Sequence, residues 1–223
     1  QTLRWQGRGR TPLRWPIVGL GLTVLSGMLL VSVLSTGWPA IALHDLLRAH
    51  IVLGSMGWIV GLIIAVAFTV VPMFLVAPTW PSYLNRYLSQ ALLATALAVV
   101  VDAHLLILLA LPLLSWFLAL LKLLRQSQRR ADPARYLWGW GGFNLLLVAV
   151  LTPWIDELSA LFDTPSQAPV ILAGYFLFAG VIPIITAMLA KIIPFLLWME
   201  FRLQVKSGGS LRHMGQLFPE RWL

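Results

Sequence analysis

Long apolar segments run through the whole of this 223-residue chain, and they restrict the folds open to it. One of them, RAHIVLGSMGWIVGLIIAVAFTVVP (Arg48–Pro72), carries no Lys, Asp or Glu and no arginine after its first residue. A helix needs about 20 apolar residues to cross the hydrocarbon core of a bilayer. The chain is 11% charged, whereas soluble domains contain about 25% charged residues. We therefore predict an integral membrane protein in a lipid bilayer.

The apolar segments predict six transmembrane helices, and hence an all-α polytopic membrane helix bundle forming a single domain over residues 1–223. The expected spans lie near residues 16–36, 50–73, 86–101, 104–121, 137–154 and 169–190. The third and fourth spans are the ambiguous pair, because few polar residues interrupt the sequence from Ala91 to Leu121. A single helix of that length would exceed the bilayer's thickness, so we expect two short helices joined at VDAH (Val101–His104).

The distribution of basic residues indicates the orientation. Six spans with the N-terminus inside place all but one of the 16 Lys and Arg residues on the inner side, the exception being Arg48. We predict cytoplasmic N- and C-termini and a multi-pass protein of a bacterial-type inner (plasma) membrane. Orientation accounts for the net charge of +8, so no nucleic-acid partner is expected. The chain starts at Gln1 without a methionine, so we expect that residues were removed or that an upstream part exists.

Three of the four histidines are expected at the outer membrane edge. These are His44, His50 and His104, with Asp45 and Asp102 nearby, whereas the fourth falls in the inner tail. Neutral imidazole is a frequent ligand of haem iron, copper and zinc. The grouping predicts a haem or metal site with His50, His104 and His44 as candidate ligands. Hydrogen bonding to water and headgroups is the favoured alternative for His44, and His104 could equally stabilise the turn beside Asp102.

Small residues continue from His50 along one face of its helix. Gly54, Gly57 and Gly61 follow it at positions that lie one above the other on a helix. Without side chains at these positions another flat object can approach the backbone closely. A neighbouring helix is the usual object and a porphyrin face the rarer one. The three glycines are therefore candidate cofactor-binding residues, with helix packing as the alternative.

The histidine that opens the second span, its glycine-rich helix and the closing VVP resemble the second helix of haem–copper oxidase subunit I and its nitric-oxide-reductase relatives. The later segment KIIPFLLWMEF (Lys191–Phe201) is similar to segments of membrane proteins of that broad group. The resemblance implies that His50 ligates a low-spin haem near the outer face. The family's catalytic subunit has about twelve spans and further histidines for copper and a second haem. Those histidines are absent here, so the resemblance implies at most one haem or metal site.

Three functions remain open from the sequence. The first is a cofactor-holding or accessory subunit of an electron-transfer complex, binding haem b or, alternatively, copper, together with other membrane subunits in a quinone- or pigment-containing complex. The absence of cysteine excludes thioether attachment of the haem. The others are a cofactor-free structural or assembly subunit and a small transporter. No complete catalytic constellation is recognisable, so no enzymatic activity of the chain alone is predicted.

The sequence also predicts the contacts of two polar residues in the later spans. Lys191 ends the last predicted span, and we expect its amine to reach the inner headgroups. A proton-relay role is the less favoured alternative, because no carboxylate is placed to pair with Lys191 at depth. Asn144 lies in the fifth span, where an amide more often forms an interhelical hydrogen bond than a substrate contact. The sequence shows no convincing internal repeat.

Overall fold

The computed structural model describes residues 10–161 and 167–204, and the regular elements of those residues are helical. Six helical segments are long and apolar enough to cross a membrane. They are Pro12–Thr36, Leu43–Leu75, Ser82–Val101, Ala103–Gln126, Pro133–Trp154 and Ala168–Glu200. The predicted all-α polytopic bundle with six spans is confirmed.

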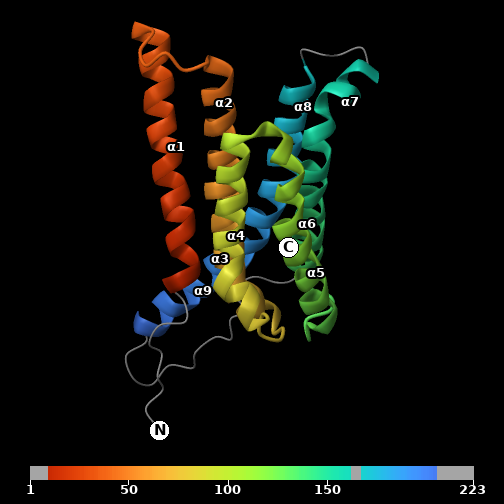
Figure 1. Cartoon of the computed structure of the whole chain (residues 1–223). Helices are drawn as coiled ribbons and strands as arrows, with labels where there is room; N and C mark the ends of the chain where they lie inside the picture. Colours follow the sequence, from red (N-terminus) through yellow and green to blue (C-terminus); the bar gives the residue numbers. More distant parts are fainter. Residues whose placement is uncertain (1–9, 162–166, 205–223) are drawn as a thin grey trace.

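Several spans are built from more than one helical segment (Figure 1). The first three spans comprise α1 (Arg10–Thr36), then α2 (Leu43–Val52), η1 (Leu53–Val60) and α3 (Gly61–Leu75), then α4 (Ser82–Val101). The fourth and fifth comprise η2 (Ala103–Leu109) and α5 (Ala110–Gln126), then α6 (Pro133–Leu151) and η3 (Thr152–Trp154). After α7 (Ile155–Leu161), the sixth comprises α8 (Ala168–Tyr175), η4 (Phe176–Val181) and α9 (Ile182–Gln204).

The expected break between the third and fourth spans is present at VDAH. Asp102 has an extended backbone (φ −139°, ψ 117°), which ends α4. Its carboxylate then accepts a hydrogen bond of 2.9 Å from the main-chain N–H of His104 at the start of η2. The second and sixth spans are longer than expected, at 33 residues each. His44 therefore lies within the helix that forms the second span.

Two pairs of spans share one plan, although the sequence shows no convincing repeat. In each pair a single helix is followed by a 33-residue span that contains a π-helical segment, η1 or η4. In the first pair, Gly19 of α1 lies against Gly57 of η1. In the second, Gly141 of α6 lies against Gly180 of η4. Small residues permit such close approach of helices in a membrane. The hairpin of α4 and α5 lies between the two pairs (Figure 1).

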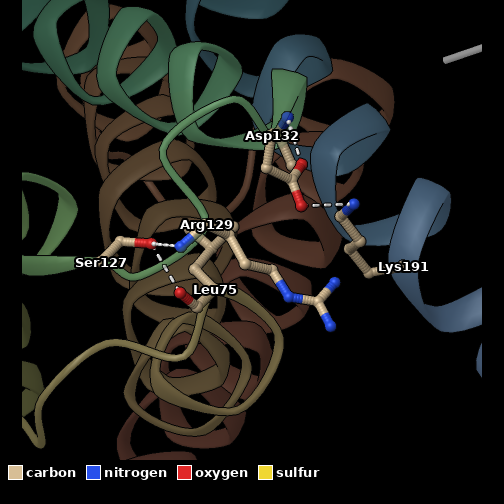
Figure 2. Close-up of polar contacts among 6 residues, drawn as sticks. Leu75, Ser127, Arg129, Asp132 and Lys191 are labelled. Atoms are coloured by element: carbon tan, nitrogen blue, oxygen red, sulfur yellow. Dashed lines mark hydrogen bonds and ion pairs between the residues drawn. The ribbon is translucent and has the colours of Figure 1, made fainter. Parts of the chain in front are cut away.

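The two pairs are tied together where α3 ends and the α5–α6 loop begins. We call this the basic end of the bundle, because the end of α5 and the loop that follows it carry the exposed arginines Arg125, Arg129 and Arg130. The hydroxyl of Ser127 donates a hydrogen bond of 2.5 Å to the main-chain oxygen of Leu75 (Figure 2). Phe74 of α3 meets Phe195 of α9 edge to face, with ring centroids 5.9 Å apart. The histidine-bearing segments α2 and η2 lie toward the opposite end.

Candidate functional site

The ring of His50 is held against α1 through one of its nitrogens. Nδ1 lies 3.1 Å from the main-chain oxygen of Thr23 and 3.1 Å from the hydroxyl oxygen of Ser26. A carbonyl oxygen can only accept a hydrogen bond, so Nδ1 is the nitrogen that donates. In the neutral ring the other nitrogen, Nε2, then carries the lone pair. The contact with α1 thus fixes both the orientation and the tautomer of His50.

A notch on α1 receives this ring. A Cβ atom on Gly27 would lie 3.1 Å from Cε1 of His50, so the absence of a side chain there leaves room for the imidazole. Gly19, Thr23 and Gly27 recur at every fourth position of α1 and hence occupy one face of that helix. This spacing of small residues was a readable signal for the residues of α1 that contact His50. What the sequence does not disclose is which helix that face meets.

The glycine stripe that follows His50 faces α1 along its length. A Cβ on Gly54 would lie 3.2 Å from Cγ2 of Thr23, and one on Gly61 would lie 3.4 Å from Cγ of Pro16. Between them, Gly57 is next to the backbone of α1. The sequence left two possible occupants of this surface, a neighbouring helix or a porphyrin. In the structure a neighbouring helix, α1, lies against all three glycines.

The other two candidate ligands are at the surface. The side chain of His44 is 83% exposed, with its Nδ1 3.7 Å from the carboxylate of Asp45. The side chain of His104 is exposed in η2. No hydrogen bond or ion pair joins either ring to His50 in the described part of the chain. Residues 10–161 and 167–204 also hold no group of three or more His, Asp or Glu side chains placed for a metal ion.

A buried ion pair occupies the basic end of the bundle (Figure 2). Nζ of Lys191 in α9 lies 2.7 Å from Oδ2 of Asp132, with only 15% and 7% of the two side chains exposed. The other carboxylate oxygen of Asp132 accepts a hydrogen bond of 3.0 Å from the N–H of Ala134 and so caps α6. The expectation that Lys191 has no carboxylate partner is wrong, because packing of α6 against α9 brings Asp132 beside it. The capping pattern Asp132-Pro133 was visible in the sequence, but its second partner was not.

A second polar contact joins α6 to the sixth span. The hydroxyl of Tyr175, at the end of α8, donates to the side-chain oxygen of Asn144. The amide nitrogen of Asn144 donates to the main-chain oxygen of Trp140 at 2.7 Å, and the Asn144 side chain is fully buried. Asn144 thus makes the interhelical hydrogen bond that the sequence led us to expect.

The fold and these contacts define the class of the molecule: an integral membrane protein with six helical spans. Comparison of the chain with models of protein families, with curated proteins and with solved structures found no match.

Proposed function

We propose that this protein is a membrane subunit that binds a b-type haem through Nε2 of His50 and serves an electron-transfer complex. The observation that carries the proposal is the pair of contacts at Nδ1. Histidines that ligate metals almost always donate their other ring N–H to a carbonyl, a carboxylate or water, which orients the ring and raises the basicity of the ligating nitrogen. His50 has this arrangement, with Thr23 supplying the carbonyl.

Haem fits a single imidazole better than copper does. A porphyrin supplies four of the iron's ligands, so one histidine from the protein would be enough to hold a haem. A copper site needs several protein ligands, typically more than one imidazole or a thiolate. The sequence contains no cysteine, and the described residues form no group of three or more His, Asp or Glu side chains that could hold a metal ion. When bound, the haem would supply one-electron chemistry. His50 would hold it, and the contacts of Nδ1 with Thr23 and Ser26 would set the basicity of Nε2.

An absorption spectrum of the full chain, purified in mild detergent, tests this function. We expect a Soret band in the oxidised state and sharpened α and β bands after reduction with dithionite. His50→Ala should abolish these bands, whereas His44→Ala and His104→Ala, which change exposed rings, should leave them intact. A colourless wild-type protein from haem-replete cells contradicts the proposal, and so does an unchanged spectrum in His50→Ala.

Ser26→Ala provides a finer test of the same site. Removing this hydroxyl leaves the Thr23 carbonyl as the acceptor of the Nδ1 proton and alters the hydrogen bonding of the ring. Because such partners tune ligand basicity, we expect a shifted reduction potential with the haem retained. A potential equal to that of the wild type would contradict a role of the Ser26 hydroxyl in tuning the ligand.

A cofactor-free structural subunit is the second candidate, and one observation favours it. Helix α1 fills the space beside all three glycines of the stripe, so the contacts of His50 could serve only to hold two helices together. On this reading the purified protein is colourless, and His50→Ala lowers its thermal stability. Measuring the spectrum and the unfolding temperature on the same samples distinguishes the two functions.

A further inference from the structure

Exposed cations are concentrated where α5 ends and α6 begins. We call residues 122–135 the α5–α6 corner. Lys122, Arg125, Arg129 and Arg130 are exposed there, and Arg135 is half-buried. The single carboxylate of the corner belongs to Asp132, which is already paired with Lys191 at 2.7 Å. The corner therefore presents a surface of unbalanced positive charge.

These cations have no carboxylate partner among residues 10–161 and 167–204, where the ion pairs involve other arginine and lysine side chains. In Figure 2 the guanidinium of Arg129 extends toward the side on which Lys191 approaches Asp132. The carboxylate of Asp132 contacts Lys191 and makes no ion pair with Arg129. Arg129 is left available to an anion from outside the chain.

Main-chain contacts hold the corner in place. The N–H of Arg129 donates to the hydroxyl oxygen of Ser127 at 3.2 Å, and that hydroxyl is itself anchored on Leu75. Nη1 of Arg135 donates to the main-chain oxygen of Arg130 at 3.2 Å. The backbone that presents Arg129 and Arg130 is therefore ordered before any ligand arrives, which lowers the entropic cost of binding one.

An apolar strip continues from the corner along the membrane-spanning part of α6. Tyr136, Trp140 and Phe143 are exposed and follow one another at helical spacing. The ring of Phe143 also contacts Phe117 of α5, with centroids 6.2 Å apart, so the strip runs beside that helix. Aromatic side chains of this kind are typical of the boundary between headgroups and acyl chains. Cations at one end and an apolar strip below them match the two parts of a phospholipid.

We propose that the α5–α6 corner binds the headgroup of an anionic phospholipid, with phosphate oxygens on Arg129 and Arg130 and acyl chains along the strip on α6. Basic clusters at the cytoplasmic boundary of transmembrane helices attract anionic lipids. Arginine is suited to this contact because its guanidinium binds phosphate oxygens through two parallel hydrogen bonds. This proposal is independent of haem binding.

Native mass spectrometry of the full chain in detergent, titrated with phosphatidylglycerol or phosphatidylcholine, tests the proposal. We expect phosphatidylglycerol to bind more tightly and the double variant R129Q/R130Q to bind it about 25-fold more weakly, or about fivefold for each charge removed. The matched control is R14Q/R86Q, which removes two exposed arginines from the same end of the bundle. Far-UV circular dichroism establishes that both variants are folded.

Three outcomes would overturn the proposal. The first is equal binding of the two lipids by the wild type, and the second is an equal loss of affinity in R129Q/R130Q and R14Q/R86Q. The third uses inorganic phosphate as competitor: if phosphate at millimolar concentration displaces phosphatidylglycerol, the site recognises a free anion and not a lipid. Retention of the lipid in phosphate, together with its loss in R129Q/R130Q, supports a lipid site.

Discussion

Replacing Gly19 by alanine should separate α1 from the second span. A Cβ built on Gly19 lies 2.5 Å from the main-chain oxygen of Gly57 and 3.1 Å from the main-chain nitrogen of Trp58. These are backbone atoms, so no side chain can rotate away and one helix has to move. Gly21, two residues further along α1, provides a matched control, because a Cβ at that position would have nothing within 4 Å.

The two substitutions should change the stability of the protein in the same way except for the steric collision at Gly19. Alanine is favoured over glycine in a helix by up to about 1 kcal/mol, so Gly21→Ala should leave the free energy of unfolding unchanged or raise it slightly. Overpacking costs about 1–3 kcal/mol where the surroundings have to shift. Gly19→Ala should therefore be about 1–3 kcal/mol less stable than Gly21→Ala. At about 2–4 °C per kcal/mol for a chain of this size, the difference is measurable by thermal unfolding in mild detergent.

The displacement of α1 in Gly19→Ala should also change the contacts of His50. The hydroxyl of Thr23 donates to the main-chain oxygen of Gly19 at 2.8 Å, and the main-chain oxygen of Thr23 accepts the hydrogen bond from His50. Moving α1 outward at Gly19 would lengthen the hydrogen bond between Thr23 and His50, because Thr23 lies about one helical turn from Gly19. Equal stability of Gly19→Ala and Gly21→Ala would refute the close approach of α1 to η1.

Three further substitutions test the remaining interhelical contacts by thermal unfolding. Lys191→Met strands the buried carboxylate of Asp132 and should cost about 3 kcal/mol, whereas the double variant with Asp132→Asn should recover part of that loss. Tyr175→Phe removes a hydroxyl bonded to a buried amide and should cost about 0.6–1.7 kcal/mol. Gly141→Ala places a Cβ 2.7 Å from a main-chain oxygen and should cost about 1–3 kcal/mol, whereas Gly139→Ala, with 3.6 Å to its nearest neighbour, should be tolerated.

The number of spans was predictable because the length and composition of each apolar segment decide by themselves whether it can cross the membrane. The break at Asp102 was predictable too, since a helix through Ala91–Leu121 would be too long for the bilayer. The lengths of the second and sixth spans were not predictable from hydropathy. Both continue beyond the apolar segment into residues that are polar but still helical, such as His44 and Glu200. A helix can leave the hydrocarbon core without ending, so composition does not locate its last turn.

Contacts between helices were harder to predict than the helices themselves. The sequence singled out His50 and its glycines, but the partners Thr23 and Ser26 lie more than 20 positions earlier, and the spacing of small residues around Thr23 does not show which helix they meet. The partner of Lys191 was equally hard to predict. Asp132 lies in the α5–α6 loop, and the topology shows only that this loop is on the same side of the membrane as Lys191. Spacing along one helix shows which residues share a face, and only the packed structure shows which helix that face meets.

The two similar pairs of spans bear on what His50 is for. In the second pair, one polar hydrogen bond joins the first helix to the long span just before its π segment, and a hydroxyl, that of Tyr175, supplies it. In the first pair a bond at the corresponding place, just before η1, comes from an imidazole. Both groups hold two helices together, but in the neutral imidazole the second nitrogen carries a lone pair, which a tie between helices does not require. This difference between otherwise similar pairs is the reason to look for the ligand at Nε2 of His50.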